Sequence, residues 1–69
     1  MSFIICATGI YKSYVGNGTY IVDGEKYATF VDILKAKKYS SRGRAESAAN
    51  RLSESCRNLK TYEIIEIND

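Results

Sequence analysis

The chain has 69 residues, of which 45% are hydrophobic and 26% are charged, so its composition is that of one small globular domain rather than a disordered segment. Its net charge of +2 is too small to identify a nucleic-acid-binding protein from composition. The absence of histidine excludes Ser-His and Cys-His nucleophile pairs. We therefore expect a single domain over residues 1–69 that is not an enzyme.

The first half of the chain has the pattern of an antiparallel meander. Residues 3–11 are rich in β-branched and aromatic side chains and predict a first strand. The segment 16–18, Gly-Asn-Gly, predicts a hairpin turn, and residues 19–22 predict a second strand. Asp23-Gly24 predicts a second turn, followed by a third strand over residues 25–31. Residues 32–38 stay ambiguous between an irregular edge and a helical turn with Asp32 as its N-cap.

The second half predicts one helix and one strand. Ser40 or Ser41 can cap a helix over residues 42–57, and Asn58 is a candidate left-handed C-cap residue. The apolar positions of this helix share one face: Ala45, Ala48, Ala49, Leu52 and Cys56. Alanine on that face predicts a close approach of the helix to the sheet.

The last strand is predicted over residues 61–67. Because apolar residues fall on both of its faces, we expect it inside the sheet rather than at an edge. The predicted fold class is α+β: a four-stranded antiparallel sheet in β-β-β-α-β order, with one helix packed on one face.

The two cysteines, Cys6 and Cys56, lie among apolar neighbours. We interpret them as buried reduced thiols of a cytoplasmic protein, with a Cys6–Cys56 disulfide as the alternative. Two separated cysteines without histidine form no recognised metal-ligand set, so neither a metal nor another cofactor is expected. The apolar N-terminal run is too short for a transmembrane span and has no cationic residues before it, so no membrane partner is expected.

A basic corner precedes and enters the predicted helix, and it is the best candidate for a binding site. Its members lie between Ile33 and Ala45, where the chain has no acidic residue: Lys35, Lys37, Lys38, Arg42 and Arg44. Cations in a first helical turn oppose the helix dipole, and a local rule broken in this way can indicate function. Such a corner suits an acidic protein surface or a phosphate group, and its plain alternative is a solvated face.

Tyrosine is unusually frequent, with six in the chain. Tyr11, Tyr14, Tyr20 and Tyr27 fall in the predicted meander, and we take Tyr20 and Tyr27 as further candidate binding residues. Tyrosines on an open sheet can bind a protein partner or stack on unpaired bases. The structural alternative is that they occupy the sheet face that a single helix leaves uncovered.

Several short motifs of residues 26–67 resemble those of very small phage and mobile-element proteins. They are Ala36-Lys-Lys-Tyr39, the serine-capped segment Ser41-Arg-Gly-Arg-Ala-Glu46, Leu52, and the strand Tyr62-Glu-Ile-Ile-Glu-Ile67. The chain is similar in size and make-up to anti-CRISPR proteins and other host-takeover factors, which generally bind and block a host complex.

This resemblance implies a non-catalytic, protein-binding inhibitor or modulator that acts in the host cytoplasm on a bacterial defence or nucleic-acid-processing complex. The alternative is a small nucleic-acid-binding protein that uses the basic helix N-terminus for phosphate contacts. A homodimer is a further partner that the small size of the core makes natural.

Overall fold

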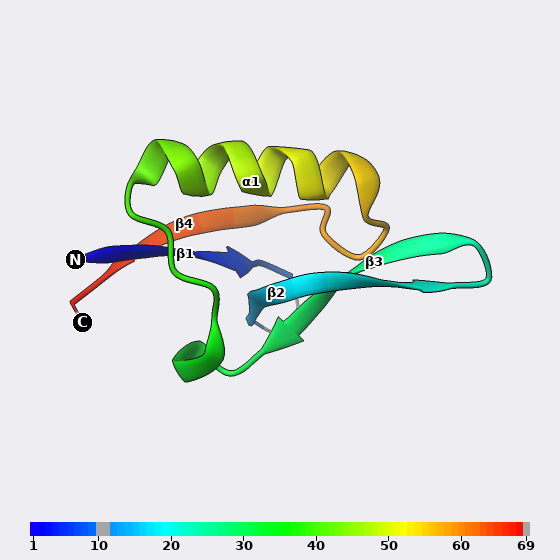
Figure 1. Cartoon of the computed structure of the whole chain (residues 1–69), viewed down its shortest axis with the longest axis horizontal. Coiled ribbons are helices and arrows are strands. Elements are labelled where there is room, and N and C mark those ends of the chain that lie inside the picture. The colour runs from blue at the N-terminus through cyan, green and yellow to red at the C-terminus, as the bar shows by residue number, and fades with distance from the viewer. Residues whose placement is uncertain (10–11, 69) are drawn as a thin grey trace.

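The computed structural model describes residues 1–9 and 12–68, which form a four-stranded antiparallel sheet and one α-helix. The strands are β1 (Ser2–Ala7), β2 (Ser13–Val22), β3 (Glu25–Val31) and β4 (Tyr62–Ile67), and the helix is α1 (Arg42–Ser55). Their order in the sheet is β3-β2-β1-β4, and α1 lies across one face (Figure 1). The predicted α+β class and element order are therefore confirmed.

The first hairpin turn was predicted at the wrong place. β1 ends at Ala7, and the segment 16–18 lies inside β2, where three residues stand opposite the single residue Thr29. This bulge needs glycine, because a Cβ atom on Gly16 would come within 2.9 Å of the Val31 side chain and Gly18 has φ +79°. The predicted end of the first strand at Tyr11 lies outside the described residues.

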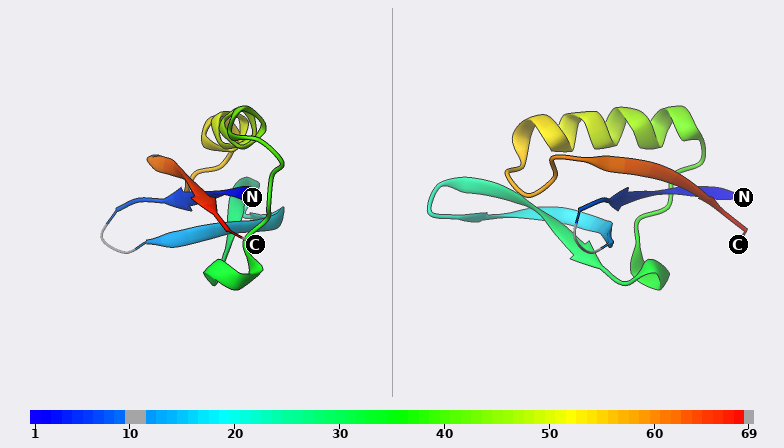
Figure 2. Two further views of the ribbon diagram at one scale, coloured as in Figure 1. Left: turned by 90° about the vertical axis from the view of Figure 1, so that its left-hand side faces the viewer. Right: turned by 180° about the vertical axis from the view of Figure 1, so that it is seen from behind.

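The second turn is the predicted one. Asp23 and Gly24 have φ angles of 51° and 79°, the pair of positive values that a tight two-residue hairpin turn requires. Beyond the bulge, the β2–β3 hairpin extends past the end of α1, so its tip lies away from the rest of the molecule (Figures 1 and 2). The side chains of Tyr20, Ile21 and Val22 on this tip are exposed.

The helix begins at the predicted residue. Ser41 is its N-cap, and its side-chain oxygen accepts a hydrogen bond from the Arg44 N–H at 3.2 Å. The alanines of the predicted apolar face, Ala45, Ala48 and Ala49, are buried. They pack into a core with residues of every strand except β4, which contributes partly buried side chains at its margin. A small-residue helix face thus allows the close approach that the sequence predicts.

The position of β4 differs from the prediction, since it is an edge strand. Both of its faces are nevertheless partly covered. Tyr62 and Ile64 pack against the core under α1, while Ile67 lies on the other face beside Ile33 and Leu34. The segment that holds those last two residues contains the short 3-10 helix η1 (Ile33–Lys35), on the side of the sheet opposite α1 (Figure 1). The apolar residues on both faces of β4 are therefore explained by partial cover from α1 on one side and from the η1 segment on the other, and not by a central position in the sheet.

η1 begins where the sequence allowed a helical turn. Asp32 is its N-cap by position, but its side chain makes no capping hydrogen bond. Ala36, directly after η1, is buried, and the Lys37 N–H donates to the Val15 carbonyl at 3.0 Å. Two residues of β1, Ile4 and Cys6, alternate with the core residues beneath α1 and so point to this second side, where they are fully buried.

The end of the helix also differs from the prediction. Asn58 is not a left-handed cap: the helix ends at Ser55, and Cys56 is its C-cap with an extended backbone. The Asn58 side chain instead pairs with the outer edge of β3, accepting from the Ala28 N–H at 2.7 Å and donating to the Ala28 carbonyl at 2.9 Å. Beside it, the Arg57 guanidinium binds both Glu25 carboxylate oxygens at 2.9 Å. The Asn58 amide thus makes the two hydrogen bonds to Ala28 that a neighbouring strand would otherwise make.

Asn58→Ala is expected to lower the free energy of unfolding by about 1–3 kcal/mol, because it leaves the N–H and C=O of buried Ala28 without their partner. Urea denaturation measures the change. Asn50→Ala is the matched control, since Asn50 is exposed on α1 and alanine suits a helix well. Equal stability of the two variants would show that the side-chain pairing contributes nothing.

Candidate binding groove beside the helix

A groove with a volume of about 600 Å³ runs along the flank of α1 at its N-terminal end. Its lining residues come from the approach to the helix and from the helix itself: Lys37, Lys38, Tyr39, Ser40, Gly43, Arg44, Ser47 and Arg51. The two segments meet because Tyr39 pairs with Phe3 of β1, which holds the chain before the helix against the sheet. Cations from two elements therefore gather around one depression.

A second hollow continues this groove toward the base of the β2–β3 hairpin. It shares Lys37, Tyr39 and Arg51 with the first and adds Lys26 of β3. We call the two together the basic groove, and its cations are Lys26, Lys37, Lys38, Arg44 and Arg51. Among the described residues that line it there is no aspartate or glutamate. Its described lining thus carries several cations and no carboxylate, which favours an anionic ligand or surface.

Tyr39 lies at the centre of the basic groove. The Lys37 ammonium lies 5.2 Å from the centroid of its ring, within the range of a cation–π contact. Burial raises the pKa of the Tyr39 hydroxyl, while the charge of Arg51 acts in the opposite direction. Near neutral pH the phenol is therefore protonated, and its O–H can donate a hydrogen bond to an anion bound in the groove.

The structure divides the predicted basic corner. Lys37, Lys38 and Arg44 lie in the basic groove. Arg42 lies on the opposite flank of α1, where its guanidinium is 5.4 Å from the centroid of the Phe3 ring and donates to the Ile64 carbonyl at 3.4 Å. Lys35 belongs to η1 and lines a different hollow. Residues close together in sequence thus lie on three surfaces.

The candidate tyrosines form a pair on the hairpin. The rings of Tyr20 and Tyr27 are stacked, with centroids 5.6 Å apart and an angle of 21° between their planes. Along β3, Ala28 points to the core beneath α1, so Tyr27 points to the other face, as does its cross-strand neighbour Tyr20. The tyrosine pair therefore lies on the opposite face of the hairpin from Lys26 and the basic groove.

Two cations of the groove were missed in the sequence. Arg51 follows Arg44 by seven residues on α1, a spacing that places both on one face of a helix. That spacing could have identified Arg51. No spacing in the sequence could have identified Lys26. Its place beside the helix depends on the course of the β2–β3 hairpin, which the bulge in β2 determines.

The two thiols are apart from the groove. Cys6 and Cys56 are free and buried, as the sequence predicts, and no disulfide joins them. Burial raises the pKa of the Cys6 thiol above its ordinary value of 9.0, Glu63 raises it further, and Lys12 opposes both. The Lys12 Nζ lies 3.8 Å from the Glu63 Oε1, so these two side chains form an ion pair. A thiol with a raised pKa is a poor nucleophile at neutral pH, which agrees with a role in packing.

No cluster of three or more His, Cys, Asp or Glu side chains has the arrangement of a metal site in residues 1–9 and 12–68. Within the same residues, no helix combines the length and the hydropathy that crossing a membrane requires.

Comparison with known proteins adds no relative. No protein-family model, no curated protein and no solved structure matches this chain.

Proposed function

We propose that this chain is a non-catalytic binding protein that inhibits or modulates a partner complex by docking its basic groove against an acidic protein surface. The observation that carries the proposal is the gathering of cations from three elements around one groove whose described lining has no carboxylate. An acidic patch on a partner would meet complementary charge along the groove, which accelerates association and sets orientation.

Exposed aliphatic side chains favour a protein over a nucleic acid as the partner. Leu34 is 90% exposed and Ile21 is 69% exposed, on η1 and on the hairpin tip respectively. Protein interfaces bury such side chains, whereas single-stranded nucleic acids stack on aromatic rings. The hairpin tip also carries Asp23 in its turn, a charge that would repel phosphates.

The biological setting of the proposal comes from the resemblance to phage and mobile-element proteins. Anti-CRISPR and host-takeover factors of this size act by occupying a surface of a host complex. A bacterial defence or nucleic-acid-processing complex in the cytoplasm is accordingly the proposed target.

A nucleic-acid-binding protein is the second candidate, and one observation favours it. The basic groove combines its cations with the ring of Tyr39 and lies at the N-terminus of α1, where the positive end of the helix dipole favours a phosphate group. Phosphate contacts there would be sequence-independent and strongly dependent on salt.

The experiment is affinity capture of the tagged chain from bacterial lysate, with and without nuclease, followed by binding measurements on the captured partner. Arg44→Glu with Arg51→Glu is expected to weaken binding at least about tenfold, because it reverses two charges of the groove. The control is Lys35→Glu with Lys60→Glu, which changes the net charge equally at exposed sites outside the groove.

The outcomes separate the two functions. A protein partner that survives nuclease, loses affinity with the groove variant and keeps it with the control supports the proposal. If binding vanishes with nuclease and falls by orders of magnitude between about 50 and 200 mM salt, the chain binds nucleic acid. Equal losses in both charge variants would mean that net charge, rather than the groove, governs binding.

A further inference from the structure

The outer edge of β4 carries backbone groups that no other described strand uses. Successive residues of an edge strand direct their N–H and C=O groups alternately into the sheet and out of it. The Thr8 N–H on the β1 side donates to the Thr61 carbonyl, so odd-numbered residues of β4 face β1. Arg42, on the far side, donates to the Ile64 carbonyl, so even-numbered residues face outward.

The hydrogen bonds on the side of β1 that faces away from β4 agree with this assignment. Phe3 exchanges both of its backbone hydrogen bonds with Tyr39, so Phe3 directs its polar groups away from β4. Its cross-strand neighbour in β4 is Glu66, which consequently directs its own N–H and C=O outward. Tyr62, Ile64 and Glu66 therefore present hydrogen-bonding groups at the free edge.

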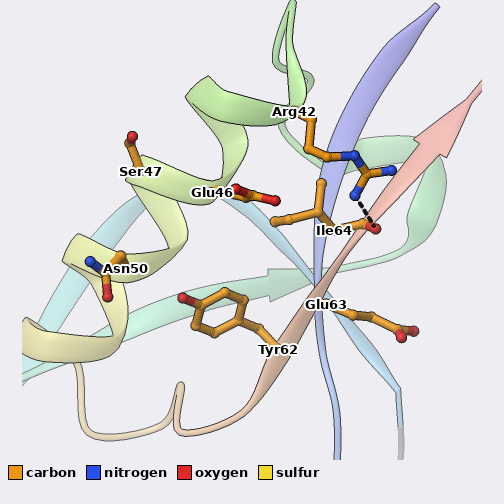
Figure 3. Close-up of a pocket in the computed structure, with 7 residues that line it drawn as sticks. All are labelled: Arg42, Glu46, Ser47, Asn50, Tyr62, Glu63 and Ile64. Carbon is orange, nitrogen blue, oxygen red and sulfur yellow. Dashed lines mark hydrogen bonds between the residues drawn. The ribbon is translucent and has the colours of Figure 1, made fainter.

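A groove of about 480 Å³ separates this edge from α1 (Figure 3). Arg42 and Glu46, one helical turn apart, extend from α1 toward β4 above Ile64. Ile64 and Tyr62 project from the strand on the same side and are only partly buried. The edge thus combines backbone groups that no described strand pairs, the apolar side chains of Tyr62 and Ile64, and charged groups of both signs, namely Arg42, Glu46 and Glu63.

We infer that this edge is a homodimer interface, in which β4 pairs antiparallel with β4 of a second copy about a two-fold axis at Ile64. With the axis there, Ile64 pairs with Ile64 of the second copy, and Tyr62 pairs with Glu66 of the second copy. All of these residues direct their N–H and C=O outward, so every backbone bond in this register has both a donor and an acceptor once the Arg42 guanidinium, which lies 3.4 Å from the Ile64 carbonyl, turns away from it.

The side chains fit the same register. Glu63 would lie opposite Ile65 of the second copy, and Glu66 opposite Tyr62, so no carboxylate faces another. A shift of the two-fold axis by one residue, to Glu63, would place Glu63 opposite Glu63 of the second copy, and like-charge repulsion disfavours that register. The alternation of residues in β4 is thus compatible with self-pairing about Ile64.

The helices add charge complementarity. α1 packs over β1 and β4, and strands are spaced about 4.8 Å apart, so the two helices would lie about 10–14 Å from each other across the axis. Across that gap Arg42 of one copy faces Glu46 of the other, and the reverse pair is generated by symmetry. Arg42 and Glu46 of the two copies together carry no net charge, and this alternation of sign across the axis favours a second copy of the chain as the partner.

The interface leaves the basic groove accessible. Arg44 and Arg51 lie on the flank of α1 that faces Tyr39, away from β4. The dimer would carry one basic groove on each outer side. The inference does not rest on the proposed function, since it concerns a different edge and a different partner.

Sedimentation equilibrium over about 1 μM to 1 mM protein tests the dimer. Glu46→Lys is expected to raise the dimer dissociation constant at least about tenfold, because it leaves four cations around the axis. Glu54→Lys, on the exposed part of the same helix outside the groove, is the matched control and is expected to change that constant by less than about twofold.

A second variant addresses the backbone directly. A synthetic chain N-methylated at the Ile64 amide keeps every side chain and every bond to β1, but it cannot donate across the axis. It is expected to remain folded and monomeric. In the unmodified chain, hydrogen exchange at the Ile64 amide is expected to slow as protein concentration rises.

A monomer at every concentration would overturn the inference, as would a dimer that persists after N-methylation with unchanged affinity. A dimer whose Ile64 amide exchanges at the same rate as in the monomer would place the interface elsewhere. Each of these results leaves the basic groove untouched, so the proposed function is tested separately.

Discussion

Leu59→Ala is expected to lower the free energy of unfolding by about 3 kcal/mol, within the range of about 2–5 kcal/mol measured for buried leucines. Leu59 lies in the loop between α1 and β4, yet its side chain is fully buried and belongs to the core cluster. Its removal would leave a cavity between the helix and the sheet. A chain of this length has a total stability of about 3–10 kcal/mol, so the variant would lose between about a third and all of it.

Leu34→Ala provides the same chemical change without the cavity. Leu34 is 90% exposed on η1, so its truncation is expected to alter stability by less than about 0.5 kcal/mol. Thermal and urea denaturation followed by circular dichroism compare the two variants. If they were equally stable, Leu59 would not be a core residue and the loop after α1 would pack differently.

Ala49→Leu is expected to destabilise the protein by about 3 kcal/mol, at the upper end of the usual cost of overpacking. Ala49 is fully buried on the face of α1 that meets the sheet. Leucine has nearly the same helix propensity as alanine, so the loss cannot come from the helix itself. The added side chain would force the helix away from β1 and reduce the packing of the whole face.

Glu54→Leu controls for the larger side chain. Glu54 is exposed on α1, where leucine meets solvent and leaves the helix position unchanged. We expect stability within about 0.5 kcal/mol of the parent chain. A neutral Ala49→Leu variant would contradict the close approach of helix and sheet, since it would require space that a tightly packed interface does not have.

Local chemistry was sufficient to predict much of the fold. Asp23-Gly24 forms the predicted turn because its backbone angles suit few other residue pairs. Ser41 caps α1 because a side-chain oxygen at that position satisfies a free N–H of the first turn. The alanine face of the helix is buried as its spacing predicts. Each of these features depends on residues within a few positions of one another.

The errors in the prediction arose where distant residues compete with local preference. The segment 16–18 has the residues of a turn, but Val15 before it and Thr19 after it both pair with β3, so the segment forms a bulge inside β2. Asn58 has the preference of a helix cap, but its amide binds the backbone of Ala28, thirty positions away in the sequence. Neither partner can be read from the neighbouring sequence.

The candidate site shows the same division. The sequence by itself determined that cations gather before and within the start of α1, because charge and helix spacing are local properties. Only the tertiary structure decided which of them share a surface. The pairing of Tyr39 with β1 places Lys37 and Lys38 beside Arg44 and Arg51, while the turn of the helix directs Arg42 to β4. The physical reason is that a groove is formed between elements, and its membership depends on contacts made across the sheet rather than along the chain.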